Sequence, residues 1–414
     1  MAAVLVAVAV ARGQGGRDPA AVLEQARARL QAMARNLEKY VCVETLDRSS
    51  YRSLDQRAAS QHLVSTDRVR LEVSLAQGRE LHSWPGATRF DARDVEALIG
   101  NGPVSTGAFG GYLASVFGQP GVTFEYAGEQ TANGMRVFEY RYRVPVEASR
   151  FEIKSATAWR AAAYQGSLQV DPESLELRRL TVRTGELPPG AGFCKASTTL
   201  EYERVHIGDS DVVLPRQSQL DIVLDEAREA RNVTTFSKCR EYQAESAISF
   251  DAPAGAENAA TRSGGRARVA LPIGLPVTLA LTGPIDSTTS AAGDEIAAKV
   301  AKPVRRVGSQ EVLIPAGAIV HGRIRRVEHH LSPSPYFLVA IAFNRVESQG
   351  MVSPFAARSE PDAALAKELD ANLSVRETGF RFWGVGTFLF RTGKGSTVIP
   401  AGFESKWFTL VAGR

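Results

Sequence analysis

The spacing of apolar residues predicts one long helix at the start of the chain. Apolar side chains recur at steps of three and four along one face, at Val22, Ala26, Leu30, Met33, Leu37 and Tyr40. Asp18 can cap the first turn, and Pro19 suits the first helical position because its fixed φ is already helical. We expect an amphipathic helix that packs by this face.

After this helix the hydrophobic period changes to two. Val69, Leu71, Val73 and Leu75 alternate with polar residues, and the turn at 76–78 leads into a second short strand over 79–84. Two short helices are predicted at 91–99 and 107–117. Further strands are predicted at 122–126, 137–144, 162–170, 175–183, 198–205, 212–224 and 232–250. The pattern therefore predicts an α+β domain over 18–250, made of a long helix and an antiparallel sheet.

Residues 251–268 contain almost no large apolar side chain and cannot build a core, so they are predicted to be a flexible linker. Beyond the linker one local device is repeated. A proline followed two residues later by a glycine punctuates a turn before a β-prone run, at Pro272 and Gly274, Pro315 and Gly317, and Pro400 and Gly402. Three such units predict a mainly β, barrel-like domain over 269–414.

Composition and charge limit the classes of protein. Of the 414 residues 44% are hydrophobic, which excludes disorder throughout and suits two domains. The formal net charge of +4 is too diffuse to indicate nucleic-acid binding.

The first eleven residues resemble a targeting segment. Residues 2–11 are all Ala, Val or Leu and close with the small-x-small pattern Ala9-Val10-Ala11, so residues 1–11 are predicted to be a signal peptide. Ten apolar residues cover about half of the roughly 20 that a spanning helix needs. We expect an exported protein, periplasmic or secreted, that does not span a membrane after cleavage.

Three cysteines allow at most one disulfide within the chain. Cys194 and Cys239 are the expected pair, because each lies beside a predicted strand late in the same half. Closing that loop would stabilise the fold by roughly 4 kcal/mol in the chain-entropy model. Cys42 is expected to be a small buried apolar side chain.

The N-terminal half resembles a known family. The long helix, the antiparallel meander and the strand pair that runs from Tyr164-x-Gly166 through Val170-Asp171-Pro172 to Leu177 and Leu180 look like the LolA-type lipoprotein-carrier fold, which periplasmic RseB-like sensor proteins also use. The resemblance covers residues 18–250. It implies a half-barrel sheet whose concave face holds acyl chains, and so a lipid or a lipoprotein acyl chain as ligand. Residues 36–45 also resemble the start of uncharacterised secreted proteins from Acidobacteria-like bacteria.

The C-terminal half resembles a second family. Gly293-Asp294 followed by Ile314-Pro315-x-Gly317-x-x-x-x-Gly322 is similar to the C-terminal barrel of the TrbI family, which are scaffold proteins of secretion channels in the bacterial envelope. The resemblance covers residues 271–347. That family's transmembrane helix and Pro-rich stalk are absent here, so it implies an envelope-exposed barrel and an envelope protein as partner, rather than channel assembly.

Basic residues alternate on one predicted strand of this half. His321, Arg323 and Arg325 share a strand face that could meet anionic headgroups, polysaccharide or an acidic partner, although such a face can equally be a solvated one. His329 and His330 with His321 suggest a loose metal site, but the arginines between them would repel a cation, so no metal is expected.

Near the C-terminus, residues 393–397 are predicted to be a hairpin tip. The aromatic residues around it are expected to fill the barrel core, with an exposed aromatic surface as the alternative: Phe380, Phe382, Trp383, Phe388, Phe390 and Trp407.

No catalytic signature occurs in the sequence. Gly-x-Ser-x-Gly, His-Glu-x-x-His and Cys-x-x-Cys are all missing, so neither a catalytic residue nor a cofactor is predicted. The leading hypothesis is a non-enzymatic exported envelope protein that binds a lipid, another apolar ligand or an envelope partner. The alternatives are an oligomeric scaffold of a secretion or surface assembly and a periplasmic hydrolase. The carrier hypothesis predicts apolar side chains on the concave face of the sheet.

Overall fold

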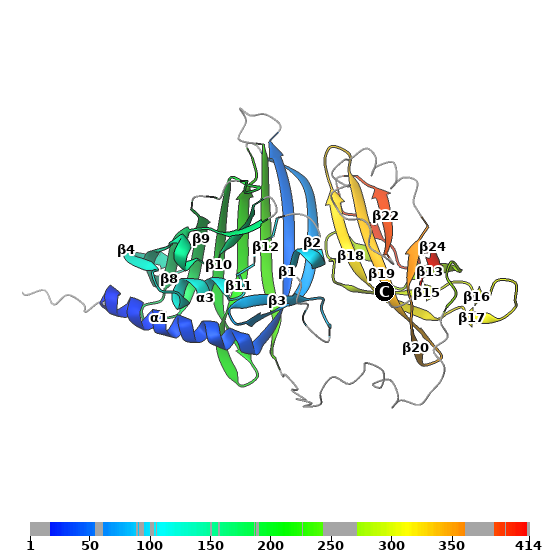
Figure 1. Cartoon of the computed structure of the whole chain (residues 1–414), viewed down its shortest axis with the longest axis horizontal. Coiled ribbons are helices and arrows are strands. Elements are labelled where there is room, and N and C mark those ends of the chain that lie inside the picture. Colours follow the sequence, from blue (N-terminus) through cyan, green and yellow to red (C-terminus); the bar gives the residue numbers. More distant parts are fainter. Residues whose placement is uncertain are drawn as a thin grey trace, which may run out of the picture.

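The computed structural model describes residues 17–53, 61–87, 90, 95–99, 103–104, 106–149, 151–155, 158–185, 187, 190–225, 227–242, 271–360, 385–393 and 395–411. The predicted signal peptide at 1–11 and the predicted linker at 251–268 lie outside these residues. The structure is mostly β, with one long helix near the N-terminus and a large antiparallel sheet (Figure 1).

The predicted N-terminal helix is confirmed as α1 (Pro19–Asn36). The side chain of Asp18 accepts a hydrogen bond from the backbone N–H of Ala20 at 3.2 Å, which satisfies one of the free donors of the first turn. Its buried face is formed by Val22, Ala26, Leu30 and Ala34. The helix ends at a short 3₁₀ turn, η1 (Leu37–Lys39). Within the described ranges, no helix has the length and the apolar character to cross a bilayer.

The N-terminal sheet is antiparallel and has nine principal strands. In spatial order they are β4 (Thr123–Ala132), β5 (Met135–Val144), β8 (Tyr164–Val170), β9 (Leu177–Thr184), β10 (Lys195–Ile207), β11 (Ser210–Val223), β12 (Arg228–Glu241), β1 (Tyr40–Ser53) and β2 (Gln61–Ala76). β3 (Arg79–Ser83) continues the sheet beside the end of β2, and β6 (Glu152–Ser155) pairs separately with β7 (Ala158–Ala161). The predicted meander is confirmed, and β1 is an addition to it.

Helices cover one face of this sheet. α1 and α3 (Gly111–Gly118) pack on one another and on the same face, which we call the covered face (Figure 1). The 3₁₀ turn η2 (Val146–Ala148) follows β5, and α2 (Val95–Ile99) packs on β3 and on the middle of β2. Both predicted short helices therefore exist; α3 begins four residues later than expected, and residues 91–94 of the other lie outside the described residues.

The C-terminal half contains only strands among its described residues. They are β13 (Pro276–Leu281), β14 (Ile285–Asp286), β15 (Glu295–Val300), β16 (Val304–Arg305), β17 (Val312–Ile314), β18 (Ile319–His330), β19 (Tyr336–Ser348), β20 (Met351–Pro354), β21 (Ala357–Ser359), β22 (Val385–Arg391), β23 (Val398–Ile399) and β24 (Glu404–Thr409). The pairings run from β20 through β19, β18, β15, β13 and β24 to β21, and the chain itself joins β20 to β21 and so closes a ring. The mainly β character of this half is confirmed, and its strands enclose a second buried apolar cluster that includes Trp407. The barrel-like domain stays a prediction.

The three Pro-x-Gly units form turns in the structure. Gly274, Gly317 and Gly402 have φ values of +80°, +87° and +83°, a region that glycine adopts without strain. The turns that carry Pro272, Pro315 and Pro400 lead into β13, β18 and β24 respectively. In the sheet β24 lies beside β13, and β15 separates β13 from β18. The three Pro-x-Gly turns therefore introduce strands that lie close together.

The two halves share one hydrogen-bonded sheet. The outer edge of β2 pairs with β3 along residues 72–76 and with β18 along residues 65–67. Between these segments the backbone N–H of Ala292 donates to the carbonyl of Arg68 at 2.9 Å, and the N–H of Arg70 donates to the carbonyl of Ala292 at 2.7 Å. The next residue, Gly293, has φ +106° and no room for a Cβ, which would lie 2.0 Å from the carbonyl oxygen of Arg70. The two buried clusters are distinct, and the division into two domains stays a prediction.

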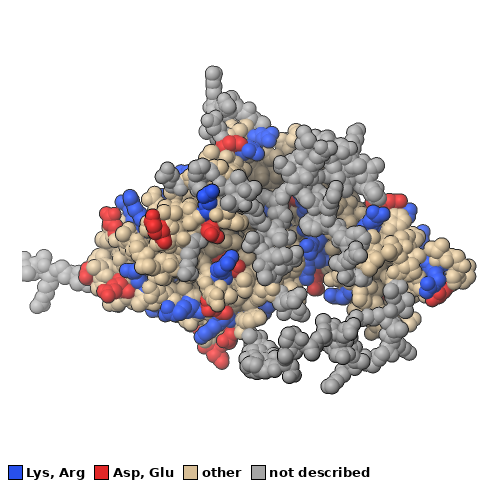
Figure 2. Space-filling view, in the orientation of Figure 1, with Lys and Arg blue, Asp and Glu red and all other residues tan. Residues whose placement is uncertain are grey.

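Charged side chains of both signs surround this junction. Asp67 of β2 lies opposite Glu328 of β18, and each carboxylate has an arginine of its own, Arg48 and Arg326. Burial would raise the pKa of Glu328, but hydrogen bonds from His330 and Arg326 and the charge of Arg326 outweigh it and lower the pKa to about 2. Burial raises the pKa of Asp67 in spite of Arg48. Over the face drawn in Figure 2, Lys and Arg are likewise intermixed with Asp and Glu.

The low pKa of Glu328 predicts acid sensitivity at the junction. A carboxyl whose pKa falls from 4.5 to about 2 stabilises the folded state above pH 4.5 by about 3 kcal/mol, and this contribution is lost as the pH falls toward 2. Glu328→Gln should therefore lower the free energy of unfolding by about that amount at pH 7. The difference from the unmodified protein should shrink below pH 4.5, as measured by urea unfolding at a series of pH values.

Glu347→Gln is the matched control for this experiment. Glu347 lies on β19 and pairs with His321, but its side chain is half exposed, so its loss should cost less than about 1 kcal/mol at any pH. A Glu328→Gln deficit that persists unchanged to pH 2 would contradict the assignment.

Candidate functional site

The covered face of the N-terminal sheet is lined by apolar and aromatic side chains. Residues from α1, α3 and six or more strands form one continuous buried cluster beneath the two helices. Its largest fully buried members are Tyr140, Tyr142, Tyr164, Phe109, Phe117, Phe138, Leu30, Leu37 and Leu113. The apolar lining that a carrier requires is therefore present, and side chains of the helices fill the middle of it.

Tyrosine hydroxyls provide the polar groups inside this cluster. Tyr142 donates to the carbonyl of Thr181 at 2.7 Å, and the hydroxyl of Tyr164 lies 2.6 Å from that of Ser115 on α3. Burial raises the pKa of Tyr164 to about 12 and that of Tyr142 well above its usual value, so both stay neutral. The buried hydroxyl of Tyr202 has no hydrogen-bond partner among the described residues.

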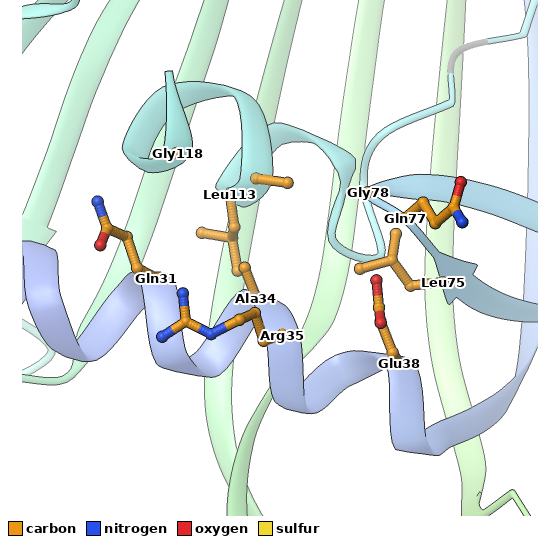
Figure 3. Close-up of a pocket in the computed structure, with 10 residues that line it drawn as sticks. Gln31, Ala34, Arg35, Glu38, Leu75, Gln77, Gly78, Leu113 and Gly118 are labelled. Carbon is orange, nitrogen blue, oxygen red and sulfur yellow. The ribbon is translucent and has the colours of Figure 1, made fainter. Parts of the chain in front are cut away.

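A pocket of about 310 Å³ opens along the seam between α1, α3 and the turn that joins β2 to β3 (Figure 3). Its apolar wall is formed by Ala34, Leu75 and Leu113, which belong to the buried cluster. Its polar rim is formed by Gln31, Arg35, Glu38 and Gln77. Across one end of the seam, the side-chain amide of Gln31 donates to the carbonyl of Phe117 at 2.6 Å and so links α1 to α3. We call this space the seam pocket.

A second pocket of about 180 Å³ lies on the other flank of α1, against the β8–β9 turn and the β10–β11 hairpin. Leu30, Met33, Leu175, Leu177 and Val212 contribute its apolar wall. Its charged rim is already neutralised within the protein. The buried carboxylate of Glu176 forms ion pairs with Arg29, Arg178 and Arg204, and Asp211 pairs with His206.

Glu80 of β3 anchors the start of α3. Its partly buried carboxylate accepts backbone hydrogen bonds from Gly107 at 2.6 Å, Phe109 at 2.6 Å and Gly110 at 3.1 Å. Gly107 and Phe109 belong to the turn before α3 and Gly110 is its N-cap, so the carboxylate fixes the backbone that leads into the helix. Burial raises the pKa of Glu80, although His82 and these donors oppose it.

A buried ion pair lies next to this anchor. His82 Nε2 lies 3.2 Å from Glu44 Oε2, and both side chains are buried beneath the helices. Burial alone would lower the pKa of His82, but the hydrogen bond and the charge of Glu44 raise it. The charge of His82 interacts with both Glu44 and Glu80, so the three side chains compensate one another inside the protein.

The cysteine prediction is wrong. The structure joins Cys42 to Cys239, and Cys194 is free and exposed. Cys42 is fully buried, as expected, but its sulfur is cross-linked rather than merely packed. The physical reason is strand order: β12 pairs with β1, so the end of β12 returns to the start of β1, whereas Cys194 pairs with the far end of β11.

The basic residues expected to form an interaction face lie on β18 at the junction. The guanidinium groups of Arg323 and Arg325 lie 6.0 and 4.7 Å from the ring centre of Trp84, and Arg323 donates to the carbonyl of Pro85 at 2.8 Å. His321 bonds Glu347 on β19. The two arginines therefore contact the N-terminal half of the same chain.

The two adjacent histidines point to different surroundings. His329 is buried and packs edge-on against Phe337, while His330 stacks on Tyr336 and bonds Glu328. Within the part of the chain that the structure describes, no three His, Cys, Asp or Glu side chains gather closely enough to hold a metal.

The C-terminal aromatic residues that are described belong to the ring's core. Trp407 is fully buried and contacts Phe343 and Phe388, and Phe390 packs on Phe403. This favours the core interpretation for these positions over an exposed aromatic surface. Phe380, Phe382 and Trp383, and Lys394 of the predicted hairpin tip, lie outside the described residues.

Sequence reasoning missed the seam pocket and its polar rim. Arg35 and Glu38 lie at the polar edge of the predicted helix, one turn apart, where the pattern indicates only solvent exposure. The one signal was Gly110-Gly111 before α3: a Cβ on Gly110 would lie 2.9 Å from the side chain of Leu75 and 3.0 Å from that of Leu37, so glycine lets the backbone approach these side chains closely.

Comparisons with known proteins leave the function open. No family model matches the chain, and no curated protein matches it. Among solved structures, the chain is similar to a putative outer membrane lipoprotein-sorting protein domain from Vibrio parahaemolyticus, at 10% identity over 53% of this chain and 92% of that one, with a TM-score of 0.28.

Two further structures are similar over the same share of the chain. A DUF1329 family protein from Desulfovibrio piger has 11% identity over 54% of this chain and 94% of its own, with a TM-score of 0.28. The lipoprotein LppX of Mycobacterium tuberculosis has 10% identity over 55% and 98%, with a TM-score of 0.19. At these scores the argument for function rests on the chain's own geometry.

Proposed function

We propose that this chain is a non-enzymatic, exported envelope protein that holds an acyl or similar apolar ligand beneath α1, with the seam pocket as the place of entry. The observation that carries the proposal is the seam pocket itself. It leads from the surface onto Leu75 and Leu113, which are part of the large apolar cluster. Its volume of about 310 Å³ lies at the lower end of the range for small-molecule sites, roughly 300–1,000 Å³.

The construction of α1 supports the proposal. A few polar contacts fasten this helix to the rest of the protein: Gln31 bonds Phe117, Tyr140 bonds the carbonyl of Pro19, and Arg29 bonds the carbonyl of Ser174 and pairs with Glu176. The remaining contacts of its buried face are apolar and non-directional. An acyl chain can replace such contacts without leaving a hydrogen-bonding group unsatisfied.

A binding series of fatty acids tests the proposal. Each buried methylene contributes about 0.8 kcal/mol, so affinity should rise about fourfold per methylene until the pocket is full and then level off. Displacement of a fluorescent fatty acid by chains of six to eighteen carbons measures this. Affinity that does not depend on chain length would contradict an apolar pocket.

Filling the pocket provides the matched variant. Ala114 of α3 lines the seam pocket and is only partly buried, so Ala114→Trp should occlude it and weaken fatty-acid binding at least tenfold. Ala28→Trp places the same side chain on an exposed position of α1 that lines neither pocket, and it should leave binding unchanged. Equal effects of the two variants would exclude the seam pocket as the binding site.

A second candidate is an oligomeric scaffold that acts through the C-terminal half. It is favoured by exposed apolar residues on β20, where the exposed fractions of Met351 and Val352 are 46% and 63%. Native mass spectrometry of the exported protein separates the two candidates, because the carrier predicts a monomer with bound lipid mass and the scaffold predicts a ligand-free oligomer.

A further inference from the structure

The rim of the seam pocket carries a cation and an anion that the protein itself does not use. Arg35 and Glu38 lie one turn apart on the exposed side of α1 and the following turn, and both line the pocket. Among the described residues, neither side chain has a hydrogen-bond or ion-pair partner. Figure 3 shows the guanidinium of Arg35 directed toward the Gln31 end of the pocket and the carboxylate of Glu38 directed toward Leu75 and Gly78.

The other pocket lacks this property. There the carboxylate of Glu176 already binds three arginines, and Asp211 binds His206. A charged ligand group entering that pocket would have to displace an internal partner. In the seam pocket a ligand can bind both Arg35 and Glu38 without displacing an internal ion-pair partner.

The chemistry of the rim defines what would fit. A guanidinium presents paired N–H donors that suit the oxygens of a phosphate, and a carboxylate accepts the N–H groups of a primary ammonium. The side-chain amide of Gln31 uses one N–H on the carbonyl of Phe117, so its second N–H remains as a donor for a phosphate oxygen at the same end of the pocket (Figure 3). The wall behind the rim is apolar, with Leu75, Leu113 and Ala34.

We infer that the seam pocket recognises a zwitterionic phosphoethanolamine headgroup, with the phosphate at Arg35 and the ammonium at Glu38, while the attached acyl chain enters the apolar wall. This inference rests on the proposed function and names its ligand class. The same headgroup chemistry occurs in a lipid and in free phosphoethanolamine, and the experiment separates these sources.

The test uses the full chain, three lysolipids with one lauroyl chain that differ only in the headgroup, and laurate as the ligand without a headgroup. Titration calorimetry compares the phosphoethanolamine, phosphocholine and phosphoglycerol lysolipids with laurate, and free phosphoethanolamine is titrated alone. The ethanolamine lipid should bind about fivefold more tightly than the phosphoglycerol and phosphocholine lipids, the largest effect typical of an exposed charge pair. Phosphocholine carries no N–H for Glu38 to accept.

Substituting the two rim residues one at a time should show which part of the headgroup each residue binds. Glu38→Gln should remove the preference for ethanolamine over phosphoglycerol, and Arg35→Gln should weaken both of these lipids about fivefold without changing their ratio to one another. Glu24→Gln and Lys39→Gln remove the same charges from exposed neighbouring positions that line neither pocket, and they should change nothing. All four positions are exposed, so folding is preserved.

The outcomes separate the inference from the proposed function. Equal binding of all three phospholipids, with affinity still dependent on chain length, would overturn the headgroup inference and leave the carrier standing. Binding of free phosphoethanolamine as tight as that of its lauroyl lipid would overturn the role of the acyl chain, and with it the carrier. Loss of preference in the Glu24→Gln or Lys39→Gln controls would show a general effect of surface charge and overturn the assignment to Arg35 and Glu38.

Discussion

Cys239→Ala is expected to lower the free energy of unfolding by about 5 kcal/mol. The disulfide with Cys42 closes a loop with a sequence separation of 197 residues, and the chain-entropy model gives a stabilisation of about that size for such a loop. Because Cys239 is only partly buried, its truncation removes little packing, and the measured change reports the cross-link. Urea unfolding of the oxidised protein gives the value.

Two controls identify the bridge. Cys194→Ala should leave stability unchanged, because this thiol is free and exposed. Dithiothreitol should lower the free energy of unfolding of the unmodified protein to that of Cys239→Ala, and it should not change the value for that variant. If Cys194→Ala were as damaging as Cys239→Ala, the two would be bonded to each other in solution and the pairing with Cys42 would be refuted.

Glu80→Ala is expected to lower the free energy of unfolding by about 3 kcal/mol, as much as Glu328→Gln does at pH 7. It leaves the backbone donors of Gly107, Phe109 and Gly110 without their acceptor and leaves His82 with one carboxylate fewer. Part of the cost is offset because a desolvated charge is also removed. Since α3 forms a wall of the seam pocket, the start of that wall should loosen, which hydrogen exchange at these three amides measures directly.

A conservative variant of Glu80 and a variant of an exposed glutamate are the controls for this experiment. Glu80→Gln keeps one oxygen acceptor and should recover part of the stability, and Glu24→Ala removes an exposed carboxyl from α1 and should cost almost nothing. Unchanged exchange at Gly107, Phe109 and Gly110 in Glu80→Ala would show that the segment before α3 is held by other contacts.

The spacing of apolar residues was sufficient to predict the helices and strands that bury one face along their whole length. Val22, Ala26 and Leu30 recur at helical spacing and all are buried in α1, and the alternation from Val69 to Leu75 marks the buried side of β2. β1 was not predicted as a long strand, because polar residues such as Asp47 and Arg48 interrupt its pattern. In the structure these residues pair across the sheet, with Arg68 and Asp67, so their polarity is compensated by a neighbouring strand.

Features that depend on which strands become neighbours could not be read from the sequence. The bridge of Cys42 to Cys239 follows from the pairing of the first strand with the last one of the N-terminal sheet. Arg323 and Arg325 look solvated in the sequence, yet they meet Trp84 from the other half. The seam pocket likewise exists only where α1, α3 and the β2–β3 turn converge, and no local period encodes that meeting.

One edge of β2 pairs with β3 along residues 72–76 and with β18 along residues 65–67, and this has a consequence during synthesis of the chain. β2 is complete at Ala76, but the strand that covers residues 65–67 begins at Ile319, so this backbone edge stays bare while more than half of the chain is still to be synthesised. Bare strand edges recruit other chains. The charged side chains of this segment, Asp67, Arg68 and Arg70, oppose such recruitment. In the finished protein Asp67 pairs with Arg48 of β1, whereas Arg70 pairs with Asp294 and Arg68 donates to the carbonyl of Thr288. The two arginines thus protect the edge of a nascent strand first and contact the C-terminal half later.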